Sequence, residues 1–365
     1  MNKKRIAFFL PNLSGGGAER VAVNLLKGML ELNIPLDLVL ASAEGPYLDQ
    51  VPQEVRTVNL AAGRVIKAIL PLSSYLKQAR PYALISHLGH ANVIACIAKN
   101  IANTKTRLVL VEHNTLSNTK SKLARSRFVG PFMKYLYPQS DAIVGVSQGV
   151  SADLQSQLDL PVGRVATIYN PVIDNELITR SKTSVDHPWF RKGAPPVFLT
   201  AGRLSAQKDF TTLIKAFAIL RKQVLARLII LGEGECRDEL ESLIDNLGIT
   251  NDVSMPGFYD NPYSYMNRAT AFVLSSRWEG LPTVLIEAMA CGCPVISTDC
   301  LSGPSEILES GTYGLLVPIG DTLALSKAML QVLDFPLNRD VLVKRGMYFS
   351  HERAVSEYLA LLDYY

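Results

Sequence analysis

Short apolar runs alternate with longer helical patterns along the chain. Most of the runs are continuous, which is typical of parallel strands buried on both faces. Between them, apolar residues recur every three or four positions, the spacing of a helix with one buried face. This pattern predicts an α/β protein. The predicted strands are Ile6–Leu10, Leu36–Leu40, Ala83–Ser86, Leu108–Glu112, Ala142–Val146, Val165–Ile168, Val197–Thr200, Leu228–Leu231, Val253–Met255, Ala271–Leu274, Val295–Ser297 and Gly314–Val317. The predicted helices are Ala18–Leu32, Ile66–Gln78, Asn92–Asn100, Phe210–Lys222, Arg237–Leu247, Thr283–Ala290, Leu323–Leu333 and about His351–Asp363.

The series of strands and helices occurs twice, which predicts two doubly wound domains with a central cleft between them. A length of 365 residues also suits two domains. We interpret the polar segment Pro171–Pro196 as the linker and expect an N-terminal domain over residues 1–175 and a C-terminal domain over 176–349. Ligands of such sheets bind beyond the carboxyl ends of the strands, so functional residues are sought there.

Charge is unevenly distributed along the chain. Residues 1–180 hold 20 Lys and Arg against 12 Asp and Glu, whereas residues 181–365 hold 17 against 21. A basic half suits a phosphorylated ligand or an anionic membrane surface. Nucleic acid is disfavoured as a partner, because no segment has the pattern of a zinc finger, an RNA-recognition motif or a basic zipper.

Other features indicate where the protein resides. No apolar run approaches the roughly 18 residues that span a bilayer, and Pro11 interrupts the first run before it reaches the length of a signal peptide. The five cysteines are an odd count, which fits a reducing compartment. We therefore expect a soluble cytoplasmic protein.

A glycine-rich segment follows the first predicted strand and opens a helix. Gly16 and Gly17 let backbone N–H groups approach an anion at the positive end of that helix. A flexible turn is the alternative. The segment is a poor dinucleotide fingerprint, since Arg20 stands where the third glycine belongs. This weakens the hypothesis of an NAD-dependent oxidoreductase.

Histidines and cysteines near strand ends are a second set of candidates. His113 follows a strand and can donate to a sugar hydroxyl or a phosphate, although a histidine held by local backbone groups is an equal alternative. His87 and His90 lack a nearby third ligand for a metal. Cys291 and Cys293 have no partner pair, so small buried residues in a turn are favoured there.

Arg203 and Lys208 follow the first strand of the second half. A guanidinium fork and an ammonium point charge together suit a diphosphate, whereas solvated surface cations are the alternative.

The segment 277–289 is the most informative part of the sequence. Pro282 is suited to beginning a helix, and the free N–H groups on either side of it, around Leu281 and Thr283, would then point at an anion. Glu279 precedes this helix and Glu287 lies within it, where carboxylates can hold sugar or ribose hydroxyls. Acidic residues are favoured near helix N-termini, which would explain Glu279 or Glu287 taken singly. It does not explain the whole segment 277–289.

With these motifs the chain resembles the retaining glycosyltransferases of family 4, which have the GT-B fold. The resemblance extends over essentially all residues. It implies that the C-terminal helix, 350–365, packs back on the N-terminal domain. Gly303-Pro304 stands where many members have a Gly-Gly pair. The motifs that carry the resemblance are Gly16, Gly17 and Glu19; Gly202, Arg203 and Lys208; and Glu279 and Glu287.

The resemblance also implies roles for individual residues. Glu279 is expected to contact the transferred hexose and Glu287 the ribose of the nucleotide. Arg203 and Lys208 are expected to clamp the diphosphate, and His113 to lie near the sugar. The anomeric configuration is retained in this family, and no dedicated nucleophile is demanded. Because the sequence has no Asp-x-Asp triplet, we expect no metal or other cofactor, and fixed cations must stabilise the departing UDP.

The acceptor side is indicated by a basic segment with interleaved apolar residues, which suits a pyrophosphate-linked lipid or an anionic leaflet. A solvated basic face is the alternative. Its cations are Lys120, Lys122, Arg125 and Arg127, and Arg64, Lys67, Lys77 and Arg80 flank a further apolar helix.

The sequence thus predicts a cytoplasmic, peripherally membrane-associated glycosyltransferase. It would move a hexose or N-acetylhexosamine from a UDP-sugar to a glycan or polyprenyl-pyrophosphate-linked acceptor in surface polysaccharide synthesis. The alternatives are a UDP-sugar epimerase of the same fold and a non-catalytic nucleotide-sugar-binding protein.

Overall fold

The computed structural model describes residues 4–119, 126–335 and 337–364. The chain forms two compact units. Unit 1 comprises Met1–Pro171 and His351–Tyr365, and unit 2 comprises Val172–Ser350. The boundary between them follows Pro171, and the chain returns to unit 1 at His351.

Unit 1 is built on a parallel sheet of seven strands in the order β3-β2-β1-β4-β5-β6-β7, counted over the described residues. The strands are β1 (Ile6–Leu10), β2 (Leu36–Leu40), β3 (Arg56–Asn59), β4 (Ala83–His87), β5 (Arg107–Glu112), β6 (Ala142–Gly145) and β7 (Val165–Thr167). The helices are α1 (Gly17–Glu31), α2 (Ile69–Ala79), α3 (Gly89–Ala102), α4 (Leu116–Thr119), α5 (Ser126–Leu136), α6 (Gln148–Gln157) and α15 (His351–Leu361), with short 3₁₀ turns η1 (Leu48–Gln50), η2 (Val65–Ala68) and η3 (Tyr137–Gln139).

One strand of this sheet was not predicted. β3 (Arg56–Asn59) lies at the edge of the sheet, and most of its residues are exposed. An edge strand needs no continuous apolar run, so the hydrophobic pattern carried no signal for it. Each of the predicted strands is present. The predicted helix 66–78 divides into the 3₁₀ turn η2 and the helix α2.

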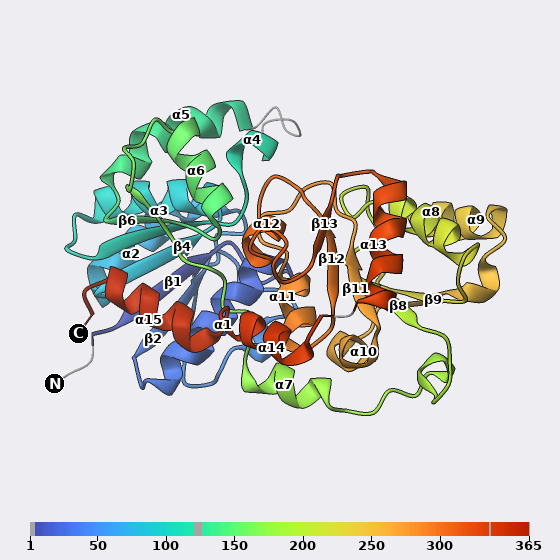
Figure 1. Ribbon diagram of the computed structural model, residues 1–365. Coiled ribbons are helices and arrows are strands. Elements are labelled where there is room, and N and C mark those ends of the chain that lie inside the picture. Colours follow the sequence, from blue (N-terminus) through green and yellow to red (C-terminus); the bar gives the residue numbers. More distant parts are fainter. Residues whose placement is uncertain (1–3, 120–125, 336, 365) are drawn as a thin grey trace. The chain divides into compact units, whose positions relative to one another are not determined.

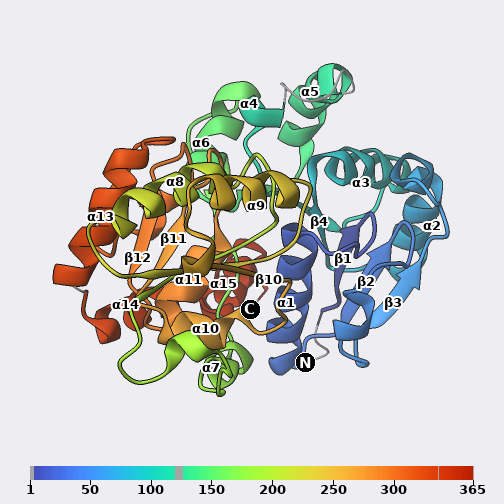
Figure 2. The same ribbon diagram turned by 90° about the vertical axis from the view of Figure 1, so that its right-hand side faces the viewer.

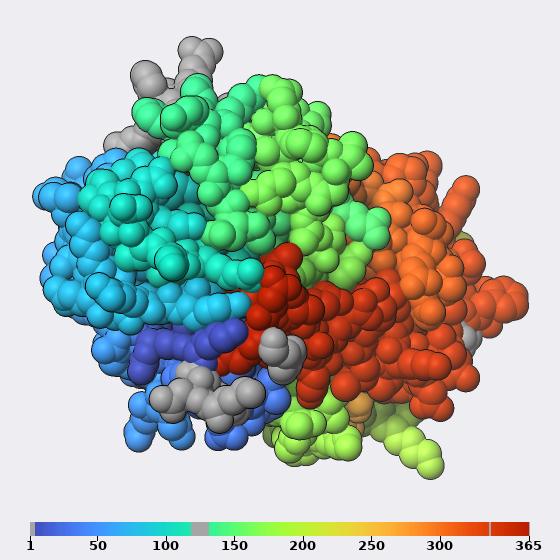
Figure 3. All heavy atoms as spheres, turned by 90° about the vertical axis from the view of Figure 1, so that its left-hand side faces the viewer, coloured from blue at the N-terminus to red at the C-terminus, as the bar shows by residue number. Residues whose placement is uncertain are grey.

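The C-terminal helix α15 is part of unit 1, where it packs beside α1 (Figure 1). A Cβ atom on Gly28 of α1 would lie 2.9 Å from a methyl group of Val355, so the two helices approach closely. Beyond α15, the Tyr82 hydroxyl donates to the Leu362 carbonyl over 2.7 Å. In Figure 3 the red C-terminal residues accordingly lie against the blue N-terminal residues of the same unit.

Unit 2 holds a parallel sheet of six strands in the order β10-β9-β8-β11-β12-β13 within the described part of the chain. The strands are β8 (Val197–Ala201), β9 (Arg227–Leu231), β10 (Val253–Gly257), β11 (Ala271–Leu274), β12 (Val295–Thr298) and β13 (Leu315–Val317). The helices are α7 (Asn175–Ser181), α8 (Phe210–Arg221), α9 (Arg237–Asn246), α10 (Pro262–Arg268), α11 (Thr283–Ala290), α12 (Pro304–Ile307), α13 (Thr322–Asp334) and α14 (Arg339–Met347), with 3₁₀ turns η4 (Pro188–Phe190) and η5 (Thr250–Asp252).

The interpretation of Pro171–Pro196 as a plain linker was wrong. Most of this segment belongs to unit 2 and contains helix α7 and the turn η4. Asp174 caps α7 by accepting a hydrogen bond from the Leu177 N–H over 2.7 Å. A helix of seven residues is too short for its periodicity to stand out in the sequence.

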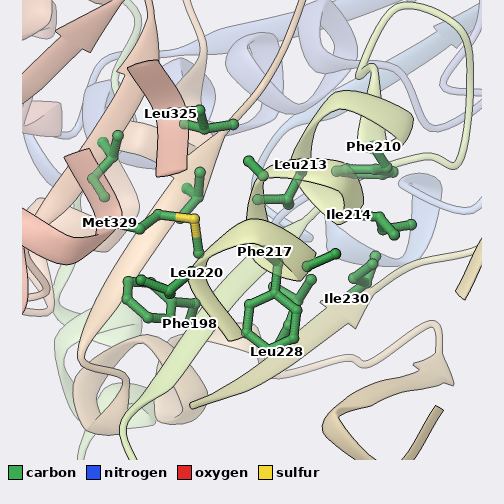
Figure 4. Close-up of a cluster of buried hydrophobic side chains, with 14 of the residues drawn as sticks. Phe198, Phe210, Leu213, Ile214, Phe217, Leu220, Leu228, Ile230, Leu325 and Met329 are labelled. Carbon is green, nitrogen blue, oxygen red and sulfur yellow. The ribbon is translucent and has the colours of Figure 1, made fainter. Parts of the chain in front are cut away.

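Helices α8, α9 and α13 pack on one face of the unit 2 sheet (Figure 2). Phe217 and Leu220 of α8 and Met329 of α13 meet the strand residues Phe198 and Leu228 in a closed apolar cluster (Figure 4). Each large apolar side chain buried in this way stabilises the fold by roughly 1.5–3 kcal/mol. This core holds β8 and its neighbour β11 rigidly, and the candidate site lies in the loops that follow these two strands.

Candidate active site

The loops after β8 and β11 lie side by side, because the two strands are neighbours in the sheet. Gln207 and Lys208 belong to the first loop, and hydrogen bonds join this loop to the second. The Ser275 hydroxyl donates to the Lys208 carbonyl over 2.7 Å, and the Arg277 N–H donates to the Gln207 carbonyl over 2.8 Å. The Gln207 side chain donates to the Trp278 carbonyl over 2.9 Å. The loops therefore form one rigid platform at the carboxyl edge of the sheet.

Lys208 and Glu279 meet on this platform. The Nζ atom of Lys208 lies 2.7 Å from Oε1 of Glu279, and the Ser276 hydroxyl donates to the same oxygen over 2.6 Å. The side chains of Lys208 and Glu279 are only 18% and 9% exposed. An ammonium group has three N–H donors, so Lys208 can bind Glu279 and still donate to a second anion. The structure thus joins two predicted site residues directly.

Arg203 lies on the same loop but has a different partner. Its Nε donates to Oε2 of Glu235 over 3.0 Å, and its side chain is 75% exposed. Lys208 and Arg203 therefore have separate carboxylate partners. An exposed ion pair contributes little free energy, so an incoming anion can readily compete with Glu235 for the guanidinium group.

The helix α11 begins at Thr283, as predicted, with Pro282 at its N-cap position. The first N–H groups of a helix have no partner within it, so they are available to an anion. Glu287 lies half-buried one turn into this helix.

The loop after β12 braces the segment that precedes α11. The Ser302 hydroxyl donates to the Gly280 carbonyl over 2.7 Å. Gly303 has a φ of +93°, and a Cβ atom there would lie 2.4 Å from Cδ of Pro282. A side chain at Gly303 would therefore displace the start of α11.

The glycines that follow β9 were not among the predicted site residues. Gly232 has a φ of +139°, and a Cβ atom on it would lie 2.0 Å from the Gly202 carbonyl oxygen. A Cβ on Gly234 would lie 2.3 Å from the Leu204 carbonyl oxygen. The Gly-x-Gly spacing after a predicted strand was the available signal. These two glycines let the loop after β9 pack directly on the loop that carries Arg203.

In unit 1, the glycine-rich segment opens helix α1 as expected. Gly16 is its N-cap, and no side chain caps the helix there. A Cβ atom on Gly16 would lie 2.4 Å from a carboxylate oxygen of Glu19, so this carboxylate lies over the predicted anion site beside Gly17. An external anion would therefore have to compete with the Glu19 carboxylate at this end of the helix.

His113 follows β5 and contacts His87, the last residue of β4. The Nε2 atom of His113 lies 3.0 Å from Nδ1 of His87. The ring of Phe8 stacks on His87 with 5.9 Å between ring centroids. Burial lowers the pKa of His113 to about 4 and that of His87 well below its ordinary value, so both imidazoles are neutral at pH 7. His87 therefore pairs with His113, a contact that no pattern in the sequence predicted.

Beside His113 lies a buried carboxyl group that the sequence analysis also overlooked. Glu112 accepts hydrogen bonds from the Asn92 amide over 2.9 Å and from the Tyr137 hydroxyl. Burial raises the pKa of Glu112 to about 7, although these two hydrogen bonds oppose the rise. Glu112 is thus partly protonated near neutral pH.

The predicted acceptor and membrane residues fall largely outside the described residues. This holds for Lys120, Lys122 and Arg125, and for the side chain of Arg127. Over residues 4–119, 126–335 and 337–364, no helix is long and apolar enough to cross a membrane. Within the same ranges, no group of three or more His, Cys, Asp or Glu side chains is arranged to hold a metal ion.

Solved structures share this architecture. The lipopolysaccharide outer core galactosyltransferase WaaB, in its apo form, matches with a TM-score of 0.78 at 22% identity, covering 98% of this chain and 99% of that one. Anabaena Alr3699/HepE in complex with UDP matches with a TM-score of 0.79 at 22% identity and the same coverage. The fold is therefore that of a GT-B glycosyltransferase.

Sequence comparison narrows this class to a family. Residues 15–176 match Glycosyltransferase Family 4, and residues 182–347 match the glycosyl transferases group 1. The N-acetylgalactosamine-N,N'-diacetylbacillosaminyl-diphospho-undecaprenol 4-alpha-N-acetylgalactosaminyltransferase of Campylobacter jejuni is 32% identical over 342 residues, 91% of this chain and 90% of that protein. The chain belongs to the family 4, group 1 glycosyltransferases and is an enzyme of that class.

Proposed function

We propose that this glycosyltransferase moves a hexose or N-acetylhexosamine from a UDP-sugar to a lipid-linked glycan, with retention of anomeric configuration and without a metal ion. The contact that carries the proposal is the one between Lys208 and Glu279, which puts a cation and a carboxylate together on a rigid platform. The UDP bound in the solved Alr3699/HepE structure supports the choice of donor. The diphospho-undecaprenol in the name of the Campylobacter relative supports the choice of acceptor.

Each residue of the platform has a role in this proposal. Lys208 and Arg203 bind the diphosphate, and Arg203 exchanges Glu235 for a phosphate oxygen. The N–H groups at the start of α11 stabilise the negative charge that grows on the departing UDP. Glu279 accepts a hydrogen bond from a hydroxyl of the transferred sugar, and Glu287 binds the ribose.

Unit 1 holds the acceptor in this proposal, and His113 contacts the transferred sugar. The acceptor hydroxyl attacks the anomeric carbon from the face that UDP leaves, and a departing phosphate oxygen takes the hydroxyl proton. No enzyme nucleophile takes part.

Calorimetric titration with UDP in EDTA tests the donor site. Lys208→Met should weaken UDP binding about tenfold or more, because a charge-assisted contact to phosphate is worth roughly 1.5–3 kcal/mol. Lys215→Met is the matched control, since Lys215 is exposed on α8, away from the platform loops. Binding of NAD but not UDP, or equal UDP affinity in both variants, would contradict the donor assignment.

Turnover tests the role of Glu279. Glu279→Gln should lower kcat for sugar transfer about 100-fold while UDP affinity stays within about twofold, because the carboxylate serves the sugar and not the nucleotide. Equal loss of both would count against this role. Conversion of a UDP-sugar without acceptor would favour the epimerase, and UDP-sugar binding without transfer or conversion would favour a non-catalytic binding protein.

We further propose that unit 1 docks on the cytoplasmic face of an anionic membrane. Ile66 and Leu70 are large exposed apolar residues one helical turn apart, and Lys67 and Arg64 adjoin them. Apolar side chains beside cations suit the boundary between acidic headgroups and acyl chains.

Liposome sedimentation tests the docking. Ile66→Ser combined with Leu70→Ser should reduce binding to vesicles that contain phosphatidylglycerol. Val162→Ser is the control, since Val162 is fully exposed elsewhere on unit 1. Equal binding to neutral vesicles would refute the electrostatic part of the proposal.

A further inference from the structure

The ring of His113 is held by a second histidine from the neighbouring strand. Strands β4 and β5 pair in parallel, with His87 opposite Val111, and this register brings the rings of His87 and His113 together. His87 is fully buried. Its ring lies against Phe8 on one side and His113 on another, so its orientation is set by packing.

The direction of the hydrogen bond between the two rings follows from the buried nitrogen that has no partner. In the structure as described, Nε2 of His87 is buried and makes no hydrogen bond. If His113 donated to His87, a neutral His87 would carry its proton on Nε2 and bury an N–H group without an acceptor. Such orphaned N–H groups are rarer in folded proteins than acceptors left without a donor.

The opposite direction leaves only a lone pair without a partner. His87 then donates its Nδ1–H to Nε2 of His113. A neutral imidazole carries one proton, so His113 must carry its own on Nδ1. The contact with His87 uses Nε2 of His113, which leaves this Nδ1–H for a ligand.

We propose that His87 is a positioning residue, which fixes the ring of His113 with its proton on Nδ1 and so makes His113 a hydrogen-bond donor at the carboxyl end of β5. The consequence of this inference rests on the proposed function. The Nδ1–H of His113 donates a hydrogen bond to an oxygen atom of the transferred sugar. In the reverse tautomer Nδ1 would be an acceptor and would select a hydroxyl proton instead. His87 thereby decides which hydrogen bond the sugar receives without touching it.

Two-bond ¹⁵N–¹H NMR spectra report the imidazole tautomers directly. The chain has five histidines, so a His113→Asn spectrum assigns the His113 signal by its disappearance. We expect the Nδ1–H form of His113 in the wild type and a mixture of tautomers in His87→Leu. His87→Asn should keep the wild-type pattern, because its amide can donate from near the former Nδ1 position. An Nε2–H form in the wild type, or an unchanged tautomer in His87→Leu, overturns the inference.

Kinetics then separate positioning from mere folding. His87→Leu should lower kcat about tenfold or more with UDP affinity unchanged, and His87→Asn should recover most of it. Ser86→Ala is the matched control: Ser86 is equally buried on β4, and its hydroxyl has no hydrogen-bond partner among the described residues. Equal losses in His87→Leu and His87→Asn at equal thermal stability would overturn the role. If the wild type transfers no sugar, the proposed function fails, and the NMR result still decides whether His87 sets the tautomer.

Discussion

Replacing Glu112 by Gln tests the cost of burying a carboxylate beside His113. Glutamine has nearly the shape of glutamate, and its Oε1 can still accept the hydrogen bonds of Asn92 and Tyr137. The substitution therefore removes an ionisable proton and leaves the packing intact. Any difference between variant and wild type that changes with pH then reports the ionisation of Glu112.

The pKa of Glu112 determines the size and sign of the effect. Burial raises this pKa from an ordinary 4.5 to about 7. Between those values the folded state binds a proton that the unfolded state has lost, so wild-type stability falls as pH rises through this window. A rise of this size corresponds to about 3 kcal/mol. Between pH 4.5 and pH 7.5, the unfolding free energy of the wild type should therefore fall by about 3 kcal/mol relative to that of Glu112→Gln.

Urea unfolding of both proteins at pH 4.5 and 7.5 measures this difference. The two tryptophans, Trp189 and Trp278, both lie in unit 2, so their fluorescence reports only that unit. Far-ultraviolet circular dichroism reports both units. A change in ellipticity that fluorescence does not follow therefore belongs to unit 1, which contains Glu112. The wild type and Glu112→Gln contain the same histidines, so the effect of histidine ionisation on stability cancels when the two proteins are compared.

A stability difference that is the same at both pH values would show that Glu112 does not titrate in this window. Tyr137→Phe provides a second check, because the Tyr137 hydroxyl donates to Glu112 and lowers its pKa. Without that donor the pKa of Glu112 should rise further, and the pH window should extend upward.

Other positions give further predictions. Gly232→Ala should cost about 2–4 kcal/mol and weaken UDP binding, because its Cβ would lie 2.0 Å from the Gly202 carbonyl oxygen; thermal melts with and without UDP check both effects. Asp37→Asn should cost roughly 2 kcal/mol at pH 7, since Asp37 is fully buried and accepts charged hydrogen bonds. Because these contacts hold the pKa of Asp37 below its ordinary value, the loss should shrink as pH falls below about 4. Glu235→Gln should tighten UDP binding a few-fold at low salt by releasing Arg203, and unchanged affinity in calorimetry would show that this ion pair does not compete.

Much of the fold was predictable because its signals are local. The predicted strands and helices are all present, and α11 (Thr283–Ala290) has the predicted bounds. The elements that were not predicted include β3 (Arg56–Asn59) and α7 (Asn175–Ser181), which were missed for different reasons. The first is an exposed edge strand stabilised by its pairing with β2, and the second is too short to show a helical period.

From the sequence alone one can predict two sheets, their strands other than β3, and the residues that follow those strands, because apolar periodicity and turn chemistry depend on neighbours within a few positions. The sequence also placed Lys208 and Glu279 at strand ends, where the carboxyl edge of a parallel sheet gathers functional groups. Which side chains meet depends on the tertiary fold. His87 and His113 are 26 positions apart, and Arg203 and Glu235 are 32 apart. Such contacts depend on strand order and register, which no local pattern encodes. The orientation of His113 and the partner of Arg203 could therefore be found only in the folded chain.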